Sequence, residues 1–212
     1  MPTRKLFRYD PMLEECDAQV TSVDGNKLTL DQTVLFAFAG GQASDTGTIG
    51  GIPTLEAAVE GDEIVYTLES EPGFSKGDTV RVKLDMGRRK TIMRLHSAAH
   101  LVYCLFNQLN DTPKLIGSNV SLGKSRLDYE YPESIKPQLP ELEEKVNEFF
   151  SLDTPIRTFP DEKNPGKWWW EGGDWKIPCG GTHVSSAREI GPVKLKRRNI
   201  GAGKERIEIT LR

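Results

Sequence analysis

The feature that most constrains this chain is the placement of its three histidines, because each lies four residues from another histidine or from a cysteine. His96 and His100 form one pair in HSAAH, and Cys179 and His183 form the other in CGGTH. Side chains four residues apart on a helix share one face, about 6 Å apart, so both imidazoles of the first pair can reach one ion. Three imidazoles and a thiolate suit zinc in type and number. The sequence therefore predicts a zinc site whose halves lie about eighty residues apart in the chain.

Cys104 continues the face of His96 and His100 by one more step of four residues. At a rise of ~1.5 Å per residue it lies ~12 Å from His96, too far to share the ion. We therefore expect Cys104 to be a small buried hydrophobic residue. With Cys16 the chain has only three cysteines, which argues against a disulfide framework and favours a reducing compartment.

The surroundings of the second pair bear on what the site does. A closed four-ligand site is structural, whereas a catalytic zinc keeps one position open. Gly180 and Gly181 would let a bound molecule approach the metal closely, and Thr182 adds a hydroxyl. HSAAH lacks the glutamate of the metallopeptidase HExxH motif, so a peptidase is disfavoured.

The period of the apolar residues changes near Asp85. Residues 16–84 form short β-like runs separated by turns such as Asp24-Gly25-Asn26, which is typical of a small antiparallel barrel or sandwich. After Asp85, a candidate N-cap, apolar residues recur at helical spacing through 88–110. We expect an α+β protein: a small antiparallel β-barrel-like domain over 1–87, then an α+β domain over 88–212 with an antiparallel sheet and a long metal-bearing helix.

Three further segments complete the expected second domain. Residues 117–131 form a strand-like segment, a second amphipathic helix is opened by Pro140, and a hairpin ends the chain. The glycine-rich residues 39–51, in the first domain, lack the Lys-Ser/Thr ending of a P-loop and are a weak nucleotide-binding signal.

The composition of the chain limits where the protein can be located and which partners it can bind. The chain is 37% hydrophobic and 28% charged, and no apolar run approaches the ~20 residues that cross a bilayer. The N-terminus lacks an apolar signal stretch, so we expect a cytoplasmic protein that does not bind membranes. The net charge is −3, yet the residues from Val193 onward are basic. This basic edge is either a solvated hairpin face or a surface for a polyanion.

The two metal motifs, the intervening GSNVS and the segment TVLFAFAGGQASDTGTI at 33–49 together carry a resemblance. The chain resembles the editing domain shared by alanyl-tRNA synthetases and the free-standing alanyl-tRNA editing proteins known as AlaX, in their medium-length form. The resemblance covers about nine tenths of the chain. The chain departs from the family pattern at Ala37, where the family has proline, and at Ala39, where the family has the first of three glycines.

The resemblance implies a zinc-dependent hydrolase of mischarged tRNA(Ala), acting chiefly on the ester to serine and secondarily on the ester to glycine, as a cytoplasmic monomer. A site built for alanine cannot strongly reject a residue differing by one hydroxyl or one methyl, so a second site must correct the product. His96, His100 and Cys179 are the implied zinc ligands, and His183 either completes the set or positions water. Cys179 and His183 are the implied catalytic residues. The implied substrate contacts are Thr33, Gly40, Gly41, Gln42 and Thr182.

Several alternatives stay open at this level. Zinc either lowers the pKa of a bound water or orients the aminoacyl group while the terminal hydroxyl of the tRNA activates water. The rival functions are a non-catalytic RNA-binding module with a structural zinc and an editing enzyme for Ser-tRNA(Thr). If tRNA binds, the basic edge is expected to contact its phosphates, together with four basic residues near the start of the metal helix. These are Arg88, Arg89, Lys90 and Arg94. The tryptophans at 168–175 are expected to pack onto the sheet, with base stacking as the alternative.

Overall fold

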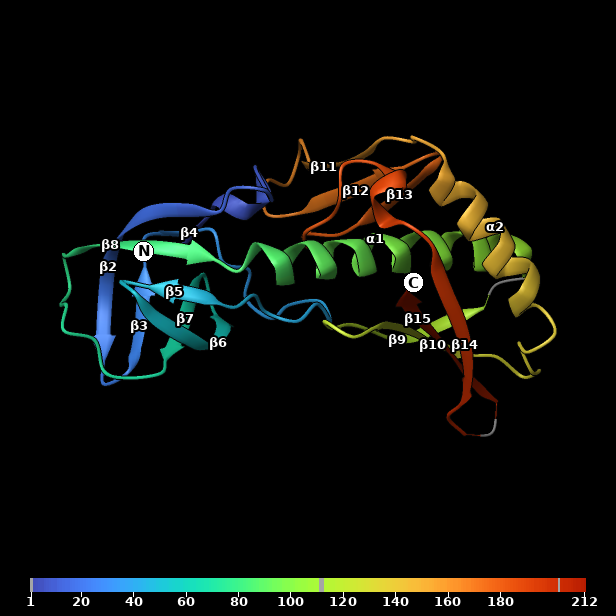
Figure 1. Cartoon of the computed structure of the whole chain (residues 1–212), viewed down its shortest axis with the longest axis horizontal. Coiled ribbons are helices and arrows are strands. Elements are labelled where there is room, and N and C mark those ends of the chain that lie inside the picture. The colour runs from blue at the N-terminus through green and yellow to red at the C-terminus, as the bar shows by residue number, and fades with distance from the viewer. Residues whose placement is uncertain (1, 111–112, 202) are drawn as a thin grey trace. The chain divides into compact units, whose positions relative to one another are not determined.

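The computed structural model describes residues 2–110, 113–201 and 203–212 (Figure 1). The chain divides into two compact units, Met1–Lys90 and Thr91–Arg212, each with its own hydrophobic core. The division falls three residues after the boundary expected from the sequence. The mixed helix and strand content expected from the sequence is confirmed. No helix in the described part of the chain is both long and apolar enough to span a membrane.

The first unit is built from short strands. Six of them close into a barrel in the order β2-β3-β7-β6-β5-β8, with antiparallel pairing throughout. Their bounds are β2 (Glu15–Asp24), β3 (Lys27–Leu30), β5 (Gly47–Ile49), β6 (Ile52–Glu60), β7 (Glu63–Leu68) and β8 (Thr79–Leu84). A parallel pair, β1 (Arg4–Lys5) and β4 (Gln32–Thr33), and the 3-10 turn η1 (Leu6–Arg8) complete the unit. Leu30, Ile49 and Tyr66 are among the fully buried residues at its centre.

Helix α1 (Met86–Leu109) begins where the apolar period of the sequence changes. The expected N-cap is confirmed, because the Asp85 carboxylate accepts a hydrogen bond from the Arg88 amide at 3.0 Å. From Thr91 onward the helix belongs to the second unit, where Met93, Leu101 and Phe106 are buried in the core. The helix is thus fixed at its first turn and held along its length by apolar burial.

The second unit packs two sheets and two helices around one core. An antiparallel sheet has the order β14-β15-β10-β9, and a smaller one has the order β11-β12-β13. The bounds are β9 (Lys114–Val120), β10 (Ser125–Glu130), β11 (Ile156–Pro160), β12 (Trp168–Gly172), β13 (Trp175–Pro178), β14 (Val193–Asn199) and β15 (Lys204–Leu211). Helix α2 (Leu139–Ser151), with Pro140 in its first turn as expected, and the 3-10 turn η2 (Ala187–Ile190) complete it.

Two parts of the second unit differ from the sequence-based expectation. Residues 117–131, expected as one strand-like segment, belong to the hairpin β9–β10, in which the Ser121 amide donates to the Lys124 carbonyl. The Trp-rich segment, for which no strand was expected, forms two strands of the smaller sheet, and its buried Trp170 shares the core cluster with residues of the larger sheet. Gly173, with φ of 59°, makes the turn between those strands, a conformation that residues with side chains rarely adopt.

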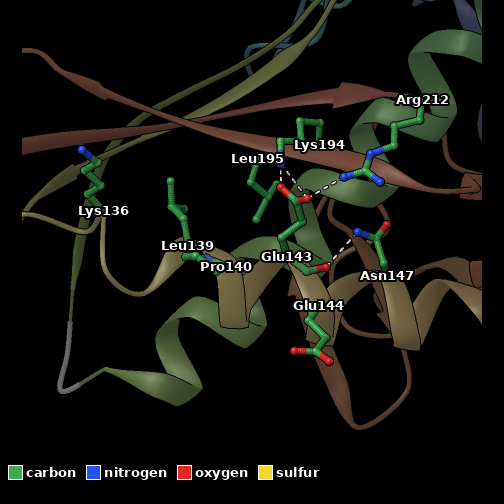
Figure 2. Close-up of a pocket in the computed structure, with 9 residues that line it drawn as sticks. All are labelled: Lys136, Leu139, Pro140, Glu143, Glu144, Asn147, Lys194, Leu195 and Arg212. Atoms are coloured by element: carbon green, nitrogen blue, oxygen red, sulfur yellow. Dashed lines mark hydrogen bonds and ion pairs between the residues drawn. The ribbon is translucent and has the colours of Figure 1, made fainter.

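Glu143 of α2 ties that helix to β14 and to the last residue of the chain (Figure 2). Its carboxylate accepts from the Leu195 amide at 2.9 Å, from Lys194 Nζ at 2.9 Å and from Arg212 at 2.6 Å. The side chain is 15% exposed and lines a cavity of about 550 Å³. Burial alone would raise the pKa of Glu143, but the amide of Leu195, Lys194 and Arg212 together lower it below its ordinary value.

Replacing this carboxylate with an amide, Glu143→Gln, is expected to lower the free energy of unfolding by about 1–2 kcal/mol at pH 7. A carboxylate with a lowered pKa stabilises the fold above its unfolded pKa and loses that contribution as the pH falls through its folded pKa. The difference between the two proteins should therefore fade below about pH 4. Urea unfolding at pH 7 and pH 3.5 measures it. Glu144→Gln, which changes an exposed neighbour, is the control and should leave stability unchanged at both pH values.

Candidate metal centre

The two metal motifs are brought together by backbone contacts on either side of CGGTH. The Cys179 amide donates to the Trp168 carbonyl at 2.9 Å, which fixes the cysteine at the end of β13 against β12. The Val184 amide donates to Ser97 Oγ at 3.3 Å, and Ser97 lies between the two histidines of α1 and is fully buried. Residues 179–184 are therefore held against the helix face that carries His96 and His100.

The four side chains converge on one point. One ligand atom from each of His96, His100, Cys179 and His183 lies within 4.8 Å of all the others. Cys179 Sγ is 3.6 Å from His96 Nε2 and 3.6 Å from His183 Nε2. Ligands of a tetrahedral zinc, each ~2.0–2.3 Å from the ion, are roughly 3–4 Å apart. The cluster could therefore hold a metal ion with little rearrangement.

Burial and unpaired nitrogens test whether the site fits a cation. His96 and His183 are buried, and His100 and Cys179 are half-buried. His100 Nε2 and His183 Nδ1 are buried without a hydrogen-bond partner among the described residues. A buried nitrogen that makes no hydrogen bond is unfavourable unless something else binds it. An ion at the centre of the cluster would bind His100 Nε2, so the donor set fits a soft or borderline cation such as zinc.

The protonation states suit a metal as well. Burial lowers the pKa of His96 to about 4, although a hydrogen bond with the Thr182 backbone opposes the change. Burial and the neighbouring histidines lower the pKa of His183 and of His100 well below the ordinary value. Neutral imidazole is the form that binds metals. Burial raises the pKa of Cys179 to about 11 in the absence of an ion, and a bound cation would favour the thiolate instead.

Side chains around the cluster fix the orientation of its ligands. The fully buried Trp170 lies with its ring centre 4.9 Å from that of His100, at 35° to it. Thr182 is buried, and its backbone bonds His96. Such outer contacts orient the imidazoles of metal sites. Thr182 was predicted from the sequence as a residue of the site, whereas Ser97 and Trp170 were not. The position of Ser97 inside HSAAH is the one sequence signal for either of them. Cys104, as expected, is buried outside the cluster.

The other expected substrate contacts belong to the barrel unit. The hydroxyl of Thr33 is fully buried and accepts hydrogen bonds from the Tyr66 hydroxyl at 2.8 Å and the Leu35 amide at 3.0 Å. Gly40 and Gly41, with φ of 58° and 83°, form a tight turn closed by the Gln42 amide and the Ala39 carbonyl at 3.0 Å. Gln42 is buried. Contact of these residues with substrate stays a prediction.

Three of the basic residues expected on tRNA phosphates are engaged within the protein. Arg88 donates to the Ser44 carbonyl at 3.1 and 3.2 Å. Arg89 is fully buried and forms an ion pair with Asp45. Arg94 donates to the Ile190 carbonyl at 2.9 Å. The expectation for Arg89 is therefore wrong, because its guanidinium has no exposed surface to offer a phosphate. The preference for packing of the tryptophans holds for Trp168 and Trp170, which are buried.

Comparison with known proteins gives the family. The model of the threonyl and alanyl tRNA synthetase second additional domain matches residues 171–208, which include Cys179 and His183. The alanyl-tRNA editing protein AlaX-M of Pyrococcus horikoshii is 36% identical over 99% of this chain and 98% of its own length. The alanine–tRNA ligase of Ignicoccus hospitalis is 31% identical over 98% of this chain, which spans 26% of the ligase. The chain therefore belongs to the family of alanyl-tRNA editing proteins.

Proposed function

We propose that this protein hydrolyses the ester that joins chiefly serine, and secondarily glycine, to tRNA(Ala). Zn²⁺ is held by His96, His100 and Cys179, with His183 as the fourth ligand or as the group that positions water. The observation that carries the proposal is the convergence of these four side chains within 4.8 Å in a chain related to an alanyl-tRNA editing protein over nearly its whole length. The similarity to a quarter of an alanine–tRNA ligase supports the same activity, because a ligase benefits from a separate site that corrects its product.

Each residue of the centre has a part in the proposed reaction. Zinc, when bound, supplies Lewis-acid chemistry for ester hydrolysis. His96, His100 and Cys179 hold it, and His183 either completes the set or holds the attacking water in place. Trp170 and Thr182, both buried, keep the imidazoles oriented and limit access of bulk water.

Discrimination between serine and alanine requires a polar contact that only serine satisfies. A buried polar group left unpaired by the wrong substrate rejects it far more strongly than a hydrophobic pocket does. We propose the turn at Gly40, Gly41 and Gln42 for this recognition. Thr33, whose buried hydroxyl accepts from Leu35 and Tyr66, is proposed to support the segment that leads to this turn. Gly40 is exposed, and the space beside its Cα is open, because the Cβ that another residue would add there meets no atom within 4 Å.

The test is incubation of the zinc-loaded protein with Ser-tRNA(Ala), Gly-tRNA(Ala) and Ala-tRNA(Ala). We expect the fastest release for serine and at least a hundredfold slower release of alanine, a ratio within reach of hydrogen-bond discrimination. Glycine also lacks the hydroxyl, so we expect its release to be slower than that of serine. Ser-tRNA(Thr) is included because the matched family model covers threonyl as well as alanyl synthetases. Inertness toward all four substrates would overturn the proposal, and activity on Ser-tRNA(Thr) alone would reassign the substrate.

A further inference from the structure

The outward face of the sheet β14-β15-β10-β9 concentrates positive charge. Alternate residues of each strand face away from the core, since Leu195, Ile207 and Leu127 on the opposite face are buried in it. Lys194 also lies at an outward position but pairs with Glu143 of α2 and is left out. Together with Lys124 in the β9–β10 turn, the other outward positions carry seven basic and three acidic residues. The basic residues are Lys114, Lys124, Arg126, Lys196, Arg198, Lys204 and Arg206, and the acidic residues are Asp128, Glu130 and Glu208. We call this set the basic face. Its excess of positive charge contrasts with the net charge of −3 of the whole chain.

The acidic residues of the basic face hold the cations in place more than they neutralise them. Glu208 accepts from Lys124 at 2.5 Å and from Arg198 at 3.3 Å. Asp128 accepts from Arg206 at 2.6 Å and is also paired with Arg126. Each of these two buried carboxylates thus binds two cations and leaves one positive charge in excess.

The cations remain available to a partner. The side chains of Arg198 and Lys124 are 65% and 48% exposed, whereas that of Glu208 is 9% exposed. Lys196 is exposed and makes no ion pair with a described residue, and Lys204 is exposed at the far end of the face. Anchored stems with exposed charged groups lose little side-chain entropy when they bind an anion.

We propose that the basic face binds the phosphodiester backbone of the tRNA substrate. The identity of the RNA rests on the proposed function. The contact between the basic face and the RNA rests on charge complementarity. A flat array of guanidinium and ammonium groups matches phosphates spaced along a strand, and it carries no sequence information. It replaces the basic residues near the start of α1, of which Arg89 is buried, as the main electrostatic contact.

The experiment measures binding of uncharged tRNA(Ala) by fluorescence anisotropy between 50 and 300 mM salt. The variant Lys196→Ala/Lys204→Ala removes two exposed charges and no side-chain hydrogen bond between residues that the structure describes. We expect a roughly tenfold higher Kd at low salt and a salt slope smaller by about 2, because each phosphate contact contributes about 0.9 to that slope. The matched control, Lys136→Ala/Lys163→Ala, removes two exposed lysines outside the basic face and should leave both quantities unchanged.

A second variant is designed to increase the affinity for tRNA instead of lowering it. Glu130→Gln removes a half-exposed acid of the basic face and should tighten binding several-fold and steepen the salt slope, which misfolding does not produce. Equal Kd and slope for the double variant and its control would overturn the proposal. Binding to phosphatidylserine vesicles without binding to tRNA would also overturn it.

Deacylation of Ser-tRNA(Ala), assayed in parallel, separates this inference from the proposed function. In an active enzyme the double variant should raise KM several-fold and leave kcat unchanged, since it removes uniform binding only. If the protein binds tRNA through this face but hydrolyses none of the esters, the binding surface is supported and the proposed hydrolase activity is refuted. If the protein hydrolyses Ser-tRNA(Ala) and the double variant has the same KM and Kd, the hydrolase activity is supported and the binding surface is refuted.

Discussion

Cys179→Ala is expected to lower kcat/KM for Ser-tRNA(Ala) at least ~100-fold and to leave the chain folded. The thiolate is the one anionic ligand of the four, so its loss weakens the metal site more than loss of an outer contact, which itself costs about 10–100-fold. The fold should persist because the second unit has an apolar core of its own, with Leu101, Phe106 and Trp170 fully buried. In that case the metal is required for catalysis and not for folding.

The measurements are metal content by mass spectrometry, the melting temperature by circular dichroism, and deacylation of Ser-tRNA(Ala). Cys104→Ala is the matched control, because Cys104 is a buried cysteine outside the cluster, and its replacement should preserve activity and metal content. Unfolding of Cys179→Ala in the manner of a chelated zinc finger would instead favour a structural zinc. Full activity without metal would contradict the role given to the centre.

The metal cluster could be predicted from the sequence because each half is local. The spacing of His96 and His100 fixes their common face once the segment is helical, and Cys179 and His183 are joined by a short turn. What the sequence does not contain is the contact that unites the halves. The hydrogen bond from the Val184 amide to Ser97 joins residues 87 positions apart, and a serine within a helix carries no mark of such a partner.

The strands around the centre were harder to predict for a different reason. Apolar alternation identifies β-like runs in the first unit, but in WWWEGGDW the outward Trp169 is as apolar as the inward Trp168 and Trp170, so the alternation disappears. The signal that was available is the Gly172-Gly173 pair between aromatic residues, which is typical of a hairpin turn.

Charge was the least reliable guide, and Arg89 shows why. Basic residues on the first turn of a helix are usually exposed, and nothing in RRK distinguishes the buried member from its neighbours. The distinction depends on Asp45, which lies 44 positions earlier in the chain and follows the glycine-rich turn. A local sequence pattern cannot reveal such a pairing. Arg89, a buried structural residue, was for this reason predicted to contact tRNA.

The buried pair of Arg89 and Asp45 explains how the two ends of the loop at residues 36–45, which contains the Gly40-Gly41 turn, are held together. Asp45 accepts from the Phe36 amide at 2.7 Å, and the Asp45 amide donates to the Phe36 carbonyl at 2.9 Å. Arg89 binds the same carboxylate and donates to the carbonyls of Val34 at 2.7 Å and Pro11 at 2.8 Å. One guanidinium thus joins three separate segments of the barrel unit, and both side chains of the pair are fully buried.

Removing one partner of this pair should be among the most destabilising single changes in the barrel unit. Arg89→Met leaves the Asp45 charge buried without a cation and two carbonyls without donors, and we expect a loss of about 3–5 kcal/mol. Hydrogen-exchange mass spectrometry should then show peptides from residues 34–45 exchanging at least ~100-fold faster, since every 1.4 kcal/mol of opening free energy is tenfold. Lys90→Met, which removes an exposed charge from the next position, should leave that exchange unchanged.

The double variant Arg89→Met/Asp45→Asn decides whether the loss comes from the unpaired charge. An amide at position 45 still offers an oxygen to the Phe36 amide but carries no charge, so the double variant should recover a large part of the stability lost in Arg89→Met. A double variant as unstable as the sum of its single variants would show that the two residues act independently. Slow exchange over 34–45 in Arg89→Met would show that the glycine-rich segment is held by the strands alone.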